Sequence, residues 1–514
     1  MKKILFPLLL MAAIAIHAQT VNITLSKEFT LKDAGNKLAG HPVKMGGFFY
    51  QLEIKYKGAQ LAYTAKLEKI KYSVIIHKLD VDMKELAHYT IGNGKEFGPF
   101  PARMVMYNNT LLVFYYQVQD EHVIKLLMTV VDPDAMQEKS ASEVCSLTEK
   151  NTGFFKMLNS LENNFLQIKH SSDHNKLLLC QAGNTQQIFT CLINQQYQIV
   201  QPRTSTINNR LTNFALNTSF LDDNDNRYIS YTYKAGKINK RGVLMQASGG
   251  KEEYVDFKTG NALWDANTLS FHMGPDHLTV YIYANFYGDY FDEGLMLSTA
   301  NISDFSFGQT RFFPYPQHIR QRLGTMGFGE KVKDSYTIRP IGYECYDMED
   351  GSLAFSGTPI FYTSDMTSHG TIVTTFGGPI INIFIMGNEC KWGVIYRSIR
   401  EEPASYFTAM PYHNKLLLLY NDGPKNINIR DTSDYKDIKK ASDLVLAKAV
   451  VSNNGDILSK EQISSNHAGS NYYFTIFEQQ VTQNEYIIPI GRVRFNLARY
   501  YTELVQYATI DIKQ

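Results

Sequence analysis

The stretch Asn108-Asn109-Thr110-Leu111-Leu112-Val113-Phe114 places two turn-forming asparagines directly before a run of large apolar residues. Asparagine tolerates the positive φ angles of a tight turn, and Leu, Val and Phe suit a buried strand. The same order of polar turn and apolar strand returns along the chain, on average every 61 or so residues. The eight apolar strands begin at Leu61, Leu111, Leu177, Tyr228, Leu278, Leu353, Leu416 and Tyr486.

Further strand-like runs follow most of these hairpins. After Tyr228, the runs Lys240–Gln246 and Glu252–Phe257 complete a unit of four strands. A four-stranded sheet cannot cover both of its apolar faces alone, and radial stacking of such sheets buries them while leaving only short edges. The repeat therefore predicts an all-β chain folded as a β-propeller of eight four-stranded blades. Seven blades are the alternative, if the hairpin before Leu61 belongs to a closing strand.

The two ends of the chain carry alternating apolar residues that could complete the ring. Val21, Ile23 and Leu25 alternate with polar residues, and the last strand-like run covers Leu504 to Ile512. Pairing of these two segments would remove the last free sheet edge. The longest irregular stretch, Phe313–Asp334, is expected to lie on a rim of the propeller.

The N-terminus has the pattern of an export signal. Met1-Lys2-Lys3 is basic, an apolar run of about 13 residues follows, and Ala18 offers a small residue for cleavage. Residues 1–18 are therefore predicted to be a signal peptide, and residues 19–514 a single propeller domain. No later segment has the ~18 uninterrupted apolar residues of a membrane span. We expect a soluble protein that is periplasmic or secreted.

The charge balance limits the classes of partner. The chain has 51 Lys and Arg against 50 Asp and Glu, a net charge of +1. Such a chain offers no basic field to attract a phosphate backbone or an anionic membrane surface. No nucleic-acid partner is expected.

Five cysteines in 514 residues are too few for a disulfide framework. One pair, Cys180 and Cys191, flanks a segment that resembles a hairpin turn around Gly183. A symmetric turn would place the two sulfur atoms opposite each other on adjacent strands and allow a disulfide. The alternative is two buried thiols that pack as small apolar groups.

The segment from Tyr281 to Glu293 mixes aromatic rings with carboxylates, the combination that binds sugars through their C–H faces and hydroxyls. The candidate binding residues are Tyr287, Asp289, Tyr290, Asp292 and Glu293. Asp289 and Asp292 could also act as the carboxylate pair of a glycosidase. The alternative is that the first tyrosines of the segment belong to the core and the rest forms an exposed loop.

The segment Asp222-Asp223-Asn224-Asp225-Asn226 concentrates oxygen ligands of the kind that bind calcium. Arg227 stands where a calcium loop of the EF type needs glycine, so a hairpin turn is the favoured interpretation. The sequence has no nucleophile elbow, zinc helix or phosphate-binding glycine loop. We therefore predict no catalytic residue, metal or cofactor.

Four segments in the C-terminal third, Tyr336–Arg339, Asp350–Gly357, Thr371–Val373 and Asn414–Asp422, resemble those of exported bacterial β-propeller-like proteins of no assigned activity. The resemblance implies that these segments form blade strands and turns, and it brings no catalytic residue.

Fold and composition together favour a non-enzymatic function. The prediction is a binding or scaffold module that contacts a protein or glycan partner through its rim loops. The alternative is a carbohydrate-active enzyme with carboxylates at the central channel, where loops from every blade of a propeller meet.

Overall fold

The computed structural model describes most of the chain after residue 20. The described residues are 21–27, 29–30, 37–57, 71–97, 103–118, 123–148, 166–171, 173–182, 187–207, 212–235, 238–255, 263–265, 268–287, 293–332, 335–367, 370–397, 399, 407–429, 438, 444–465, 472–473, 479–482, 485–496 and 499–512. The predicted signal peptide, residues 1–18, lies outside them.

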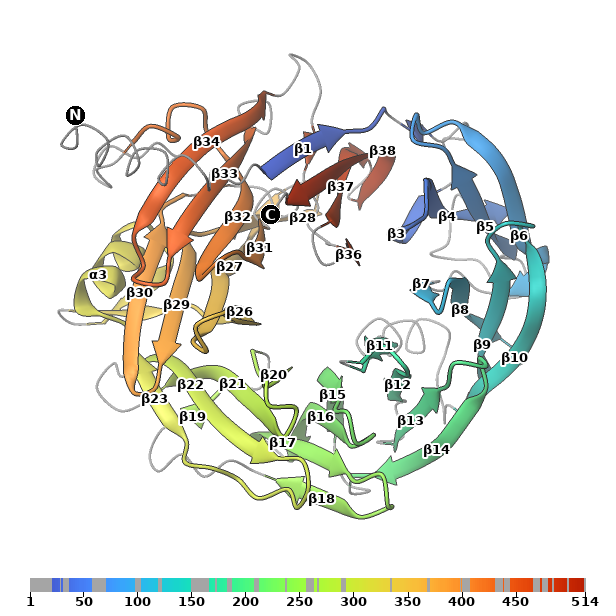
Figure 1. Ribbon diagram of the computed structural model, residues 1–514, viewed down its shortest axis with the longest axis horizontal. Helices are drawn as coiled ribbons and strands as arrows, with labels where there is room; N and C mark the ends of the chain where they lie inside the picture. Colours follow the sequence, from blue (N-terminus) through green and yellow to red (C-terminus); the bar gives the residue numbers. More distant parts are fainter. Residues whose placement is uncertain are drawn as a thin grey trace, which may run out of the picture.

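The described strands form eight antiparallel sheets of four to six strands, arranged as blades around a ring (Figure 1), and one small two-stranded sheet. Blade 1 comprises β3 (Lys37–Met45), β4 (Phe48–Lys57), β5 (Lys71–Leu79) and β6 (Glu85–Phe97). Blade 2 comprises β7 (Arg103–Tyr107), β8 (Thr110–Val118), β9 (Val123–Asp132) and β10 (Gln137–Thr148). Blade 3 comprises β11 (Gln167–His170), β12 (Leu177–Ala182), β13 (Gln187–Ile193) and β14 (Ile199–Thr206). Blade 4 comprises β15 (Thr212–Leu221), β16 (Arg227–Ala235), β17 (Ile238–Gln246) and β18 (Glu252–Val255).

The second half of the ring is more elaborate. Blade 5 comprises β19 (Leu263–Trp264), β20 (Ser270–Met273), β21 (Thr279–Tyr287), β22 (Glu293–Asn301) and β23 (Arg311–Pro314). Helix α3 (Gln317–Thr325) and the small sheet of β24 (Gly329–Val332) and β25 (Ser335–Ile338) then lead to blade 6. Blade 6 comprises β26 (Ile341–Asp347), β27 (Leu353–Thr367), β28 (Gly370–Gly377), β29 (Ile380–Met386) and β30 (Glu389–Ile395). Blade 7 comprises β31 (Phe407–Pro411), β32 (Lys415–Asp422), β33 (Val445–Ser452) and β34 (Ile457–Ser465). Blade 8 comprises β35 (Tyr472–Tyr473), β36 (Gln479–Thr482), β37 (Glu485–Asn496), β38 (Arg499–Ile512), β1 (Val21–Leu25) and β2 (Phe29–Thr30).

The predicted all-β propeller with eight blades is confirmed, although blades 5, 6 and 8 have more than four strands. Seven of the eight predicted strand starts fall within one residue of the start of the strand that pairs with the innermost part of its blade. The exception is Leu61, which lies outside the described residues. The corresponding turn of blade 1 is Gly46-Gly47, between β3 and β4.

The turn that opens blade 2 shows why asparagines precede the apolar strand. Asn108 and Asn109 have φ angles of 47° and 53° between the paired residues Tyr107 and Thr110. Two successive positive φ angles are those of a type I′ turn, whose twist matches that of the flanking strands. Asparagine adopts this conformation at lower cost than most residues.

The apolar strands are continuous because both faces of a blade are buried. In β8, Leu111 and Val113 pack in the cluster shared with blade 1. Leu112 and Phe114, on the opposite face, pack in the cluster shared with blade 3. All four side chains are fully buried. Radial stacking thus removes from water the surface that a single sheet would expose.

The ring closes as predicted, through the first strand of the chain. β1 pairs with β38 in antiparallel register, from Val21 opposite Ile512 to Leu25 opposite Ala508. Figure 1 shows β1 at the outer side of blade 8, between β34 and the first blade. Both ends of the chain therefore contribute to one blade.

Polar contacts between the turns of adjacent blades add to the apolar contacts between their faces. The Lys176 ammonium of blade 3 binds the Asp225 carboxylate of blade 4, with Nζ and Oδ1 2.7 Å apart. Asp223 of the same turn binds His277 of blade 5 at 2.6 Å. The segment once considered for calcium is thus a hairpin turn, in which Asp222 Oδ1 accepts the backbone N–H of Asn226 at 2.8 Å.

The possible disulfide between Cys180 and Cys191 does not form, and the alternative of two buried thiols holds, because both cysteines are free and buried. Cys180 lies opposite Thr190 and Cys191 opposite Leu179, so the turn is offset by one residue from the symmetric one. Because side chains alternate along a strand, this offset directs the two sulfur atoms to opposite faces of blade 3. Each lies in a different core cluster.

The predicted irregular rim segment is largely regular. Its described part contains the end of β23, helix α3 and β24. Ile319 and Leu323 of α3 are buried in the core shared by blades 5 and 6. No helix among the described residues is long and apolar enough to cross a membrane.

Candidate functional site

The predicted binding segment lies at the turn between β21 and β22 of blade 5. Tyr287, the last residue of β21, pairs with Glu293, the first residue of β22. Asp289, Tyr290 and Asp292 lie outside the described residues. The structure therefore brings together two of the five predicted residues, directly opposite each other across two strands.

The first two tyrosines of the segment, Tyr281 and Tyr283, belong to the core rather than to a binding site. Tyr283 is 3% exposed and packs in the core shared with blade 6. Tyr281 is half-buried against the same core. The prediction that these two residues belong to the core is therefore confirmed, whereas the half-buried Tyr287 at the end of the strand is still reached by solvent.

An interruption of the inner strand of blade 5 brings a third residue to Tyr287. β19 and β20 both pair with β21, and the chain between them leaves the ladder at Asp265. The Asp265 N–H donates to the Asn285 carbonyl at 2.8 Å, and the Asn285 N–H donates to Thr268 Oγ1 at 2.9 Å. These bonds fix the interrupted segment against β21. Asp265 Oδ2 accepts a hydrogen bond from the Tyr287 hydroxyl, with the two oxygens 3.4 Å apart.

Glu293 is a buried carboxylate on the other side of Tyr287. Its side chain is 5% exposed, and Oε2 accepts the backbone N–H of Ile338 at 2.6 Å. Burial raises the pKa of Glu293, while the nearby Arg320 guanidinium lowers it in part. The carboxyl group therefore holds its proton to higher pH than an exposed glutamate does.

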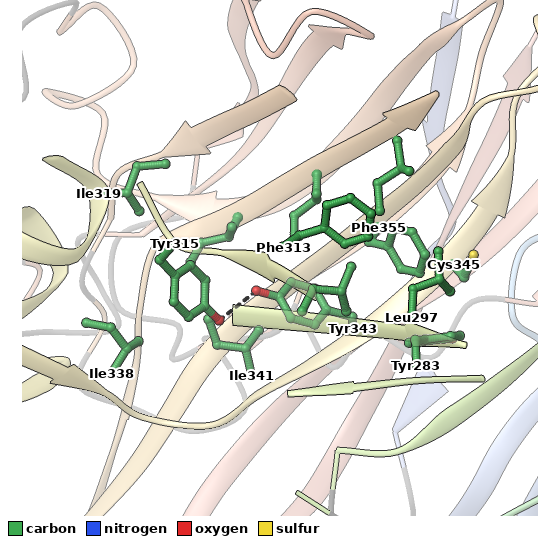
Figure 2. Packing of buried hydrophobic residues seen from close by; sticks show 14 of the residues in the cluster. Tyr283, Leu297, Phe313, Tyr315, Ile319, Ile338, Ile341, Tyr343, Cys345 and Phe355 are labelled. Atoms are coloured by element: carbon green, nitrogen blue, oxygen red, sulfur yellow. Dashed lines mark hydrogen bonds between the residues drawn. The ribbon is translucent and has the colours of Figure 1, made fainter. Parts of the chain in front are cut away.

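A chain of polar side chains continues from this point into the seam between blades 5 and 6. Figure 2 shows the hydroxyls of Tyr315 and Tyr343, which are 2.8 Å apart. The Tyr315 hydroxyl also donates to Asn285 Oδ1 at 3.2 Å, and Asn285 Nδ2 donates to the carbonyl of Ile341. Trp392 packs against the Tyr315 ring, with centroids 5.3 Å apart.

Asp265 and Glu293 lie close enough to Tyr287 to affect its pKa. Burial raises the pKa of Tyr287 strongly, and the charges of Asp265 and Glu293 raise it further. The Tyr287 phenol therefore stays protonated and lies between two carboxyl groups. Such an arrangement offers an aromatic face, one hydroxyl donor and several oxygen acceptors to a ligand.

Sequence reasoning missed Asp265, Tyr315 and Arg320. Asp265 reaches the site through the register of β19 on β21, and Tyr315 and Arg320 reach it through the connection that carries α3. For Asp265, the only local signal in the sequence is the short polar run that follows Trp264. Among the described residues, no group of three or more His, Cys, Asp or Glu side chains is placed to hold a metal ion.

No protein-family model and no curated protein sequence matches the chain. Among solved structures, it is similar to the polysaccharide lyase Uly1, with 9% identity over 95% of this chain and 99% of that one, at a TM-score of 0.41. It is also similar to a europium-containing methanol dehydrogenase, with 8% identity over 95% and 93% and a TM-score of 0.43. The uncharacterized protein lmo1340 of Listeria monocytogenes EGD-e has 11% identity over 76% and 91%, with a TM-score of 0.36. These similarities concern the fold alone and assign no activity to this chain.

Proposed function

We propose that the protein is a binding module that recognises a carbohydrate at the seam between blades 5 and 6. The observation that carries the proposal is the position of the Tyr287 phenol between the carboxyl groups of Asp265 and Glu293. Sugars present C–H faces to aromatic rings and hydroxyls to carboxylates, and this set supplies both. The nearby Arg320 adds a hydrogen-bond donor, since its buried Nε has no partner among the described residues.

The test is a glycan array probed with the mature chain, residues 19–514. Tyr287→Ala should abolish a glycan signal, and Asp265→Asn should weaken it about ten-fold, the effect of one lost hydrogen bond to a charged group. Tyr254→Ala is the matched control, because Tyr254 is an exposed tyrosine of blade 4 that lies outside the site. Unchanged binding by Tyr287→Ala would refute the proposal. A stoichiometric protein partner captured from the native envelope, without any glycan signal, would refute it equally.

The rival function is a carbohydrate-active enzyme. It is favoured by the raised pKa of Glu293, because a carboxylic acid that keeps its proton is what glycosidic bond cleavage needs as a general acid. Asp265 would be the second carboxylate. Release of reducing ends from an oligosaccharide that binds on the array, and its loss in Glu293→Gln, would establish the enzyme. Binding without release of reducing ends would refute the enzyme and support the binding module.

Export is part of the same proposal. The basic first residues, the apolar run and Ala18 support a cleaved signal peptide. The mass of the protein isolated from its native host would test it, since cleavage leaves a chain that begins at Gln19. A full-length cytoplasmic chain would refute export.

A further inference from the structure

A buried histidine of blade 1 binds two carboxyl groups at the seam where the ring closes. His77 lies on β5, and its Nε2 is 2.6 Å from Oε2 of Glu53 on β4. Its Nδ1 is 3.2 Å from Oε2 of Glu85 on β6. The side chains of His77 and Glu53 are 9% and 7% exposed. Three neighbouring strands therefore hold one imidazole ring between two carboxyl groups, largely away from water.

These two contacts determine the protonation state of His77. An ionised carboxylate only accepts hydrogen bonds, whereas a neutral imidazole has one N–H donor and one acceptor nitrogen. If both carboxyl groups are ionised, both ring nitrogens must carry protons, and His77 is an imidazolium. A neutral ring would turn the lone pair of one nitrogen toward a carboxylate, and burial strengthens that repulsion.

The other groups around His77 favour the charged ring. Glu85 Oε1 also contacts His88 Nδ1 at 2.8 Å, so the carboxylate of Glu85 lies between two imidazoles. Burial alone would raise the pKa of Glu85, but its bonds to His88 and His77 lower the pKa below the ordinary value. Glu85 therefore stays ionised to lower pH than an exposed glutamate does. Within the described part of the chain, the titratable groups in contact with His77 are Glu53, Glu85 and, ring to ring, His88.

The same imidazole ring supports the closing segment, which consists of β1 and β2. Phe29 of β2 is 9% exposed and packs against His77, with ring centroids 5.4 Å apart. Phe29 also lies opposite Val505 of β38, so it joins blade 8 to blade 1. Lys27 forms an ion pair with Asp82 of blade 1 at 3.0 Å, but both side chains are exposed and such a pair contributes little.

We propose that this cluster is a pH-sensitive latch, in which protonated His77, bound to Glu53 and Glu85, holds the closing segment against blade 1. The latch is complete at pH values where a free histidine is protonated, and it weakens as pH rises above them and the ring loses its proton. Release would uncover one edge of β38, since β1 and β2 pair with that edge and β37 with the other. An uncovered edge can pair with another strand. The latch does not depend on the carbohydrate site of blade 5.

The first experiment follows amide hydrogen exchange of the chain of residues 19–514 by mass spectrometry at pH 6 and pH 8.5, corrected for the intrinsic exchange rates. Protection of the peptide that contains β1 and β2 should fall about ten-fold at the higher pH, the effect of one lost hydrogen bond to a charged group. A peptide from β16 and β17 of blade 4 is the internal control and should keep its protection. Equal protection of the closing segment at both pH values would overturn the proposal.

Glu53→Gln distinguishes a latch from a cluster that is merely structural. The glutamine amide can donate to Nε2 of a neutral His77, so the closing segment should keep its protection at pH 8.5 as at pH 6. His277→Gln is the matched control, because it breaks an exposed histidine–carboxylate pair with Asp223 and should keep the pH dependence of wild type. A closing segment that loosens equally at both pH values in Glu53→Gln would show a structural role and refute the latch.

Nitrogen-15 NMR of the wild-type protein, labelled in its histidine rings, measures the protonation state itself. At pH 6, the signals that are absent from His77→Gln should belong to a ring protonated at both nitrogens. They should change to those of a neutral ring over the pH range in which the closing segment loses protection. A neutral His77 at pH 6 would refute the proposal.

Discussion

The hydrogen bond between Tyr315 and Tyr343 allows a quantitative test of the seam between blades 5 and 6. Both rings are 4% exposed, so neither hydroxyl can exchange its partner for bulk water without opening the seam. Tyr315 donates its single proton to Asn285 Oδ1, and Tyr343 therefore donates to the Tyr315 oxygen. Removing one hydroxyl or the other leaves different groups without partners.

Tyr343→Phe removes one donor and leaves the Tyr315–Asn285 bond in place, so the free energy of unfolding should fall by about 1 kcal/mol, the net value of one buried hydrogen bond. Tyr315→Phe leaves the Tyr343 hydroxyl and Asn285 Oδ1 both buried without partners. Each such group costs about 1–3 kcal/mol, so a loss of roughly 2–6 kcal/mol is expected for the two. The double variant should lose less than the sum, because Tyr315→Phe already breaks the bond between the tyrosines.

Urea unfolding followed by tryptophan fluorescence is a suitable assay. Trp392 lies against Tyr315 and is one of two tryptophans in the chain. Tyr254→Phe, at an exposed position, is the control and should change stability by less than about 0.5 kcal/mol. Equal losses for Tyr315→Phe and Tyr343→Phe, or losses that add in the double variant, would refute the assigned direction of these hydrogen bonds.

Three further outcomes follow from other parts of the molecule. Gly294→Ala should destabilise the fold by about 1–3 kcal/mol, because the new Cβ would overlap a backbone oxygen of β23. The Cβ of Gly249→Ala meets no atom, so this control variant should be as stable as wild type. Thermal unfolding of the two variants and wild type measures the difference. Glu293 has a raised pKa when folded, so its contribution to stability falls as pH rises above about 4.5, and Glu293→Gln should gain stability relative to wild type between pH 4 and pH 7 in urea titrations. Burial raises the pKa values of Cys180 and Cys191, so iodoacetamide should alkylate both only after denaturation, with or without reductant; an intact disulfide in the unreduced protein would contradict the structure.

The propeller could be predicted from the sequence because its decisive signals are local. A type I′ turn needs particular residues at two positions, and a strand buried on both faces needs an unbroken apolar run, as at Asn108 to Phe114. The turn of blade 1, Gly46-Gly47, gives a weaker signal in the sequence because it leads into a strand with Gln51 and Glu53 in it. Helix α3 was missed because Ile319 and Leu323 are its only large apolar residues, and tertiary packing rather than a helical stripe stabilises it.

The site was less accessible to sequence reasoning. Tyr287 and Glu293 were selected together because their segment mixes aromatic rings with carboxylates, and the structure places them opposite each other across one turn. Asp265 joins them through the pairing of strands that are distant in the sequence. The disulfide failed for a related reason: a shift of one residue in register moves a side chain to the other face, and the sequence around Cys180 does not fix that register.

The seam between blades 5 and 6 contains polar groups whose burial packing alone does not require. The seam between blades 2 and 3 contains chiefly Leu, Ile and Val side chains, and its two buried tyrosines, Tyr107 and Tyr116, donate to the Ile193 carbonyl and to Gln181. The seam between blades 5 and 6 instead includes Glu293, whose carboxylate is disfavoured by burial, and two buried tyrosine hydroxyls that must satisfy each other. Apolar residues of similar volume would hold two blades together at least as well. These polar groups lie beside an interruption of the inner strand, where Tyr287 is reached by solvent, and the proposed binding site rests on this placement.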